Sequence, residues 1–142
     1  MTTTTPAPAP TVDELMAELA DLADPKILAV NERHGDDHAV NLTKLRAVAK
    51  RVKKNHPLAV ELWATGDSAA RLLAILVCRP REFSAGELDR MLREARTRKV
   101  HDWLVGYVVM LVASFGVVAL VEGSGSAGSP IDSYKGLGRR AP

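Results

Sequence analysis

The sequence predicts an all-α fold, on the strength of three observations. Apolar residues recur with the helical period in successive segments, capping patterns precede several of these segments, and no alternating apolar run is long enough for a convincing strand. The chain has 142 residues, 46% hydrophobic and 25% charged, a balance typical of one folded domain. We expect a helical-repeat domain over residues 11–121, with disordered tails over 1–10 and 122–142.

Start and stop signals place seven expected helices. Capping boxes begin at Thr11 and Ser84, and Asp24 precedes a proline that suits the first turn of a helix. The helices are expected to begin after Thr11, Asp24 and Asn41, at Pro57 and Ala69, after Ser84 and near Lys99. The second should end at Arg33, the third at about Lys54 and the fifth at Val77.

The third and fifth helices have contrasting patterns. The fifth is apolar except for Arg71, which predicts a central buried helix. In the third, apolar side chains fall in one arc of the helical wheel, and the cationic ones take the rest. The apolar residues are Leu42, Leu45, Val48, Ala49 and Val52; the cationic ones are Lys44, Arg46, Lys50, Arg51, Lys53 and Lys54.

Charge is segregated along the chain. Residues 1–37 carry eight acidic and two basic side chains, whereas residues 38–100 carry fourteen basic and six acidic ones. A basic middle could attract a polyanion, although a solvated helix face accounts for the charge equally well. The segments 42–49 and 88–95 also match at an offset of 46 residues, a spacing within the HEAT-repeat range. A plain helical bundle explains the same periodicity.

Several kinds of chemistry have no residues to support them. One cysteine excludes an internal disulfide and a thiolate zinc cluster, and we interpret Cys78 as a core residue. No phosphate-cradling glycine loop, nucleophile elbow or Cys/His pair is present, and we expect no cofactor. Two histidines, His34 and His38, flank two aspartates; a surface cluster is favoured there over a metal site.

One short segment combines a carboxylate with an aromatic ring. Asp102 and Trp103 follow several basic residues, so they could stabilise a positively charged ligand by Coulomb and cation–π attraction. From the residues alone, a simpler interpretation is favoured, in which Asp102 sits in the first turn of a helix and Trp103 packs.

Four segments, in the same order along the chain, resemble one known family. Residues 28–35, 41–46, 61–64 and 99–103 resemble the DNA alkylation repair proteins built from HEAT-like repeats, and the likeness covers roughly residues 13–109. It implies a curved stack of helix pairs whose basic face holds duplex DNA through its phosphates. Active members of the family excise N-alkylated purines, with a carboxylate that stabilises positive charge developing on the sugar.

The resemblance also assigns site residues. It implies Asp102 and Trp103 at the lesion, and phosphate contacts from Lys44, Arg46, Lys50, Lys53, Lys54, Arg71, Arg98 and Lys99. Active members show an aromatic-Asp-x-x-Asp pattern whose second Asp is catalytic, and Val105 stands at that position here. We therefore expect a cytoplasmic, metal-free DNA-binding protein of the repair type that recognises or excises N-alkylated purines in duplex DNA. The chain is shorter than full family members, and Val105 leaves its excision activity open.

The apolar run over residues 103–121 is also compatible with a membrane anchor. It has nineteen residues without a charge, which is just long enough to span a bilayer. A buried repeat helix is favoured because the resemblance extends into the run, and an uncovered apolar face there predicts a homodimer. The alternatives are a helical scaffold that binds protein and a membrane protein anchored by residues 103–121.

Overall fold

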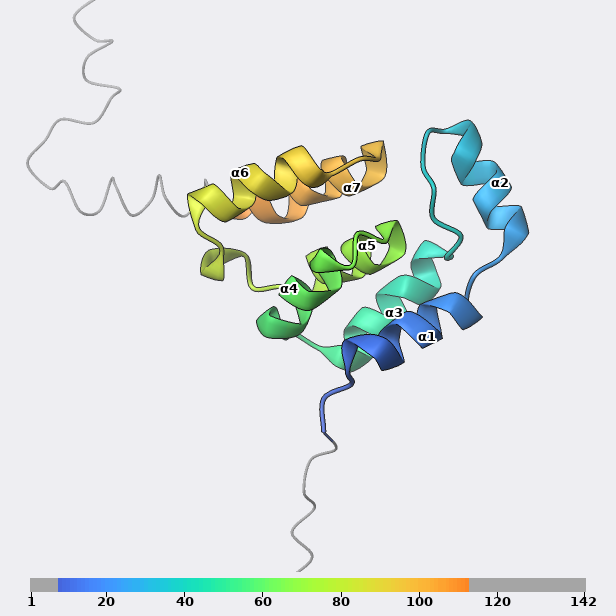
Figure 1. The fold of residues 1–142 in the computed structure, drawn as a ribbon, viewed down its shortest axis with the longest axis horizontal. Coiled ribbons are helices and arrows are strands. Elements are labelled where there is room, and N and C mark those ends of the chain that lie inside the picture. Colours follow the sequence, from blue (N-terminus) through green and yellow to red (C-terminus); the bar gives the residue numbers. More distant parts are fainter. Residues whose placement is uncertain (1–7, 113–142) are drawn as a thin grey trace, which may run out of the picture.

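The computed structural model describes residues 8–112. Over these residues the chain is helical throughout, with short connections and no strand (Figure 1). The elements are α1 (Val12–Asp21), α2 (Pro25–Arg33), α3 (Leu42–Val52), α4 (His56–Ala64), α5 (Ser68–Val77), a 3₁₀ turn η1 (Pro80–Glu82), α6 (Ala85–Glu94), α7 (Arg98–Trp103) and a π-helical segment η2 (Leu104–Val109) that continues α7. The all-α prediction is confirmed.

Local capping begins most of these helices where the sequence predicts. The Thr11 hydroxyl accepts a hydrogen bond from the Glu14 amide at 3.2 Å, and the Glu14 carboxylate accepts from the Thr11 amide. The Asp24 carboxylate accepts from the amide of Lys26, and the Asn41 side chain caps α3 in the same way. Each cap satisfies an amide that has no partner within its own helix.

Four boundaries differ from the prediction. α5 begins at Ser68, one residue before Ala69, because the Asp67 carboxylate accepts a hydrogen bond from the Ala70 amide. α3 ends at Val52, before Lys54, because Lys53 adopts a positive φ of 66° that a right-handed helix cannot continue. α4 begins at His56 because the Asn55 side chain accepts from an amide in its first turn. α7 begins at Arg98, one residue earlier than expected.

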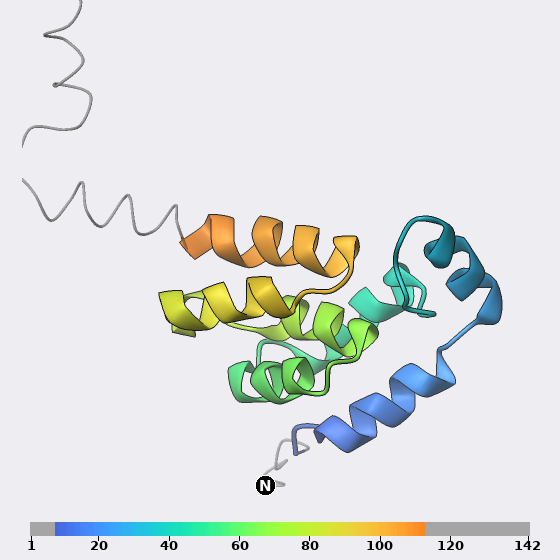
Figure 2. The same cartoon turned by 45° about the horizontal axis from the view of Figure 1, so that its top comes forward.

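α5 is the centre of the molecule. Eight of its ten residues are buried, which confirms the prediction of a central buried helix. It forms a hairpin with α4 and packs against α3 on one side and against α7 and η2 on the other (Figure 2). α1 crosses α4 and α5, and α6 pairs with the α7–η2 helix. Because α3, α5 and α7 lie in sequence along one layer, their outward side chains share a face.

The hairpins stack in the manner of HEAT-like repeats, but not with the pairing that the offset of 46 residues indicated. α3 immediately precedes the α4–α5 hairpin and packs on α5, so it occupies the position of a second helix in its pair. α6 is the first helix of the α6–α7 hairpin. The match between segments 42–49 and 88–95 therefore reflects two amphipathic helices in different positions, since the helical period alone does not distinguish them.

Part of the predicted domain lies outside the described residues. This applies to the tail over 122–142, to most of the tail over 1–10, and to residues 113–121 of the apolar run. Within residues 8–112, no helix combines the length and the apolar character needed to cross a bilayer.

Candidate nucleic-acid interface

Four cationic side chains from α3 and from the two residues after it line one groove. Arg46, Lys50, Lys53 and Lys54 enclose a volume of about 330 Å³ together with Ala49 and Leu76. Arg46 and Lys50 lie four residues apart on one side of α3, and Lys53 and Lys54 follow directly after its end. Leu76 reaches the groove from α5. No carboxylate is among the lining residues, so the positive potential of the groove is not neutralised from within.

A second groove extends the basic surface beyond the end of α3. It has a volume of about 410 Å³ and shares Lys54 with the first groove. Arg79 and Arg81 add two cations to its lining, Glu82 adds one carboxylate, and Leu111 adds an apolar wall. Lys54 is held between the two grooves because its ammonium group donates a hydrogen bond to the Leu76 carbonyl at 2.9 Å. The basic surface therefore continues from α3 into the segment that follows α5.

A row of three side chains in contact begins at the first groove. The guanidinium carbon of Arg46 lies 5.0 Å from the centroid of the Trp103 ring, a cation–π distance. The Trp103 and Tyr107 rings follow, with centroids 5.5 Å apart and planes at 75°. Arg46 belongs to α3 and Trp103 to α7, so the two side chains meet over α5, which packs between their helices. This contact brings the predicted phosphate-binding helix to the predicted lesion residue.

The remaining cations of α3 lie elsewhere. Arg51 makes a bidentate ion pair with Glu18 of α1, at 2.8 Å for one of its two hydrogen bonds. This hydrogen bonding lowers the pKa of the Glu18 carboxyl. Lys44 is exposed and precedes Arg51 by two helical turns, so it lies on the α1 side of the helix. The structure does not bring Lys44 to the groove.

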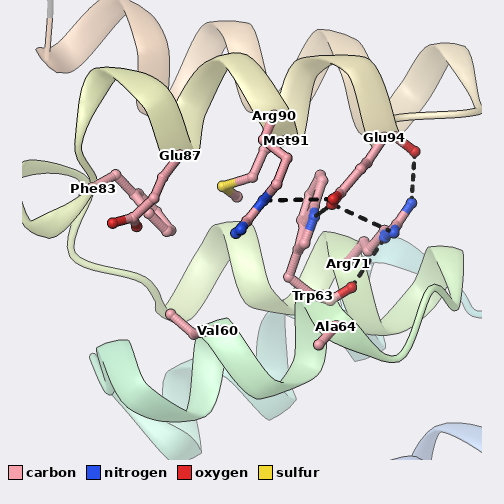
Figure 3. Close-up of a pocket in the computed structure, with 9 residues that line it drawn as sticks. All are labelled: Val60, Trp63, Ala64, Arg71, Phe83, Glu87, Arg90, Met91 and Glu94. Carbon is pink, nitrogen blue, oxygen red and sulfur yellow. Dashed lines mark hydrogen bonds and ion pairs between the residues drawn. The ribbon is translucent and has the colours of Figure 1, made fainter.

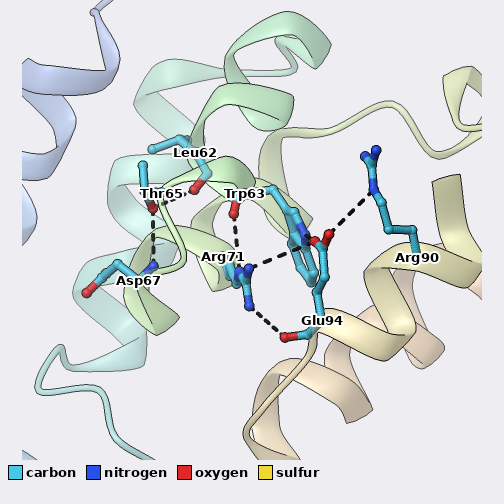
Figure 4. A network of polar contacts seen from close by, with 7 residues as sticks. All are labelled: Leu62, Trp63, Thr65, Asp67, Arg71, Arg90 and Glu94. Atoms are coloured by element: carbon cyan, nitrogen blue, oxygen red, sulfur yellow. Dashed lines mark hydrogen bonds and ion pairs between the residues drawn. The ribbon is translucent and has the colours of Figure 1, made fainter.

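Arg71 is buried and makes hydrogen bonds within the protein, so its predicted role as a phosphate contact is corrected. Its side chain is buried between α4, α5 and α6, with the guanidinium carbon 4.7 Å from the centroid of the Trp63 ring (Figure 3). Nε donates to the Trp63 carbonyl at 3.2 Å, and Nη1 donates to the Glu94 carbonyl at 2.7 Å (Figure 4). With its donors directed inward, this arginine holds three helices together.

The carboxylate of Glu94 completes the same network. It accepts a hydrogen bond from the Trp63 indole at 2.6 Å and pairs with Arg90 at 3.5 Å. These side chains border a cavity of about 340 Å³ between α4 and α6, which Figure 3 shows from close by. Cations and carboxylates both line this cavity, so it lacks the uniform charge of the α3 groove.

Asp102 lies at the surface beside other charged side chains. Its side chain is 62% exposed, and its carboxylate oxygens are 3.7 Å from Arg98 Nε and 3.7 Å from His101 Nδ1. Val105, at the position of the family's second carboxylate, is half-buried in η2. Arg98 is exposed and lies on the same side of α7 as Asp102, one turn away.

The loop between α2 and α3 fixes the start of α7. The Asp36 carboxylate accepts a hydrogen bond from the Lys99 amide at 3.0 Å, and the Thr97 side chain makes no capping bond. Asp36 is therefore a cap supplied from a distant part of the chain, and its negative charge suits a helix N-terminus. Through this cap, the loop positions the helix that carries Lys99 and Trp103.

The expectation of a surface cluster in this loop is wrong for two residues. Asp36 and His38 are both buried, at 7% and 4% exposure. The Asn31 amide group donates to the His38 carbonyl at 2.8 Å, and burial lowers the pKa of the His38 imidazole. Among the described residues, no group of three or more His, Cys, Asp or Glu side chains could hold a metal ion. Cys78 is buried in the core, as predicted.

Sequence reasoning missed three members of this interface. Tyr107 follows Trp103 by one helical turn, a spacing that would have placed both rings on one side of the helix. Arg79 and Arg81 flank a proline after α5, and no local pattern connects them to α3. Only the packing of α3 against α5 shows that they extend the groove.

Comparisons with known proteins agree with this architecture. The family described as DNA alkylation repair enzyme matches residues 15–115. One similar solved structure is from a family of proteins related to the HEAT-like repeat DNA glycosylases, with affinity for branched DNA structures. It is 27% identical, with a TM-score of 0.60, and the match covers 74% of this chain and 44% of that one. This chain thus spans less than half the length of that protein. No curated protein matches.

Proposed function

Because this chain belongs to the DNA alkylation repair enzyme family, we propose that it binds duplex DNA through the phosphate backbone at the α3 groove. The observation that carries the proposal is the lining of that groove: two cations from one side of α3 and two that directly follow its end, with no carboxylate among the lining residues. The affinity for branched DNA that is stated for the similar solved structure adds support. Phosphate contacts of this kind give affinity without sequence preference.

The charge of the groove sets the expected salt dependence. Each phosphate neutralised by Lys or Arg releases counterions, and the slope of log affinity against log salt is about −0.9 per contact on duplex DNA. Contacts from the four groove cations would give a slope of roughly −3.6, and loss of one cation would reduce its magnitude by about 1.

The test is a salt titration of duplex binding with matched lysine variants. Lys50→Gln should weaken binding and flatten the salt dependence, because Lys50 lines the groove. Lys44→Gln removes the same charge from the same helix, but on the α1 side, and should change binding little. Affinity that does not vary with salt would remove the proposal. Equal losses in the two variants would show that the groove is not the contact surface.

The proposed activity is binding rather than excision of N-alkylated purines. Catalysis in the family, as the resemblance implies, needs a carboxylate held close to the sugar, and Val105 has none to offer. Asp102 is a poor substitute because water and the neighbouring Arg98 screen its charge. We expect no release of alkylated purine from methylated duplex above the rate without protein. Release that falls in Asp102→Asn would overturn this part of the proposal and assign catalysis to Asp102.

The helical-scaffold alternative gives a different result in the same assay. A protein-binding scaffold would not retain duplex DNA even at low salt, where phosphate contacts are strongest. Retention at low salt that disappears at high salt would therefore favour the DNA-binding function over the scaffold.

A further inference from the structure

The row formed by Arg46, Trp103 and Tyr107 has a feature that phosphate binding does not use. Lysine and arginine suffice to hold a DNA backbone, yet here two aromatic rings stand beside the cationic groove. Tyr107 is 47% exposed, although burial of a ring this large would ordinarily stabilise the fold. An exposed ring at the edge of a basic groove is the arrangement that proteins use to stack nucleobases.

Tyr107 is the last and most accessible aromatic side chain of the row. Arg46 covers Trp103 from the α3 side, and this cation–π contact holds the indole in place. The Tyr107 ring stands nearly perpendicular to the indole, at 75°, so the two rings are not stacked flat on each other. Nearly half of the Tyr107 surface is exposed, so the side chain is accessible to a ligand from solvent.

We propose that Tyr107, supported by Trp103, stacks an unpaired nucleobase of the DNA whose backbone occupies the α3 groove. This inference rests on the proposed DNA binding and names its substrate class: duplex DNA that carries an unpaired base, such as a single-base bulge. In a fully paired duplex each base is stacked between its neighbours, so an aromatic side chain has no base face to contact. An unpaired base leaves the stack at lower cost, and its face is then available to the tyrosine.

The experiment compares two labelled duplexes of equal length at one salt concentration, with the full chain. One duplex is fully paired and the other carries a single 2-aminopurine bulge. Wild-type protein should bind the bulged duplex roughly tenfold more tightly, the usual scale for one base–aromatic stack. Binding should also quench the 2-aminopurine fluorescence, because the fluorophore stacks on a ring.

Two substitutions of the same residue separate stacking from folding. Tyr107→Leu keeps an apolar side chain but removes the ring; it should lower the affinity for the bulged duplex to that for the paired duplex and abolish the quenching. Tyr107→Phe keeps the ring and should retain both. Lys50→Gln should weaken both duplexes by the same factor, because its phosphate contact is common to them.

The outcomes distinguish this inference from the function on which it rests. Equal wild-type affinity for the two duplexes, with normal salt dependence, would overturn the stacking proposal and leave DNA binding intact. A preference or quenching that survives Tyr107→Leu would overturn it as well. Failure to bind either duplex at low salt would reject the proposed function, and the stacking proposal with it.

Discussion

Replacement of Arg71 by methionine tests whether this arginine supports the fold or binds DNA. Arg71→Met removes two hydrogen bonds, a cation–π contact and an ion pair with the Glu94 carboxylate at 3.9 Å, but keeps an unbranched side chain to fill the space. The Trp63 carbonyl still accepts from the Gly66 amide, whereas the Glu94 carbonyl loses the donor that Arg71 supplies. The loss at the Trp63 carbonyl is compensated, and the loss at the Glu94 carbonyl is not. Together with the lost ring contact, these changes should lower the free energy of unfolding by about 2–3 kcal/mol.

The assay is thermal and chemical denaturation, followed by DNA binding of the folded variant. For a domain of about 100 residues, the loss corresponds to a fall in Tm of roughly 10–15 °C. Arg90→Met is the control, because Arg90 also pairs with Glu94 but is mostly exposed, and it should cost less than about 1 kcal/mol. Unchanged stability of Arg71→Met with a large loss of DNA affinity would refute the reasoning and restore Arg71 as a phosphate contact.

Three further predictions concern buried groups. Burial lowers the pKa of His38 below its ordinary value of 6.5, so the unfolded chain takes up a proton first as the pH falls. The free energy of unfolding should therefore fall below about pH 6.5. Chemical denaturation at pH 7.5 and 5.5 should show a smaller fall in His38→Asn than in the wild type. An equal fall in the variant would contradict the assignment of this pH dependence to His38. Burial raises the pKa of Cys78 to about 11, so a thiol reagent at pH 8 should react slowly with the native protein and rapidly in denaturant; equal rates would show that the thiol is accessible. Asp36→Ala should lower the unfolding free energy by about 1–2 kcal/mol in thermal melts because α7 loses its cap, with the exposed Asp37→Ala as control; equal effects would contradict the capping role.

The local features of the fold were predictable because their causes lie within a few residues. Thr11, Asp24 and Asn41 cap helices through amides two or three positions away, and these starts are confirmed. The cationic side of α3 was predictable in the same way, since the helical period alone places Arg46 and Lys50 together.

The misassigned residues share a different cause. Arg71 meets Glu94 across 23 positions, and Asp36 meets Lys99 across 63. Burial of an arginine or an aspartate is stable only with such partners, and no local pattern announces them. Arg79 and Arg81 were also missed because only tertiary packing brings them beside Lys54.

Periodicity and capping act over single helical turns, so the amino-acid pattern was enough to predict the helices, several of their caps, the buried character of α5 and the cationic side of α3. Tertiary packing was needed to show which cations share a groove, which ones join helices or pair with α1, and that Arg46 meets Trp103 over α5. Those outcomes depend on how α3, α5 and α7 pack side by side, and the packing is set by contacts between residues far apart in the chain.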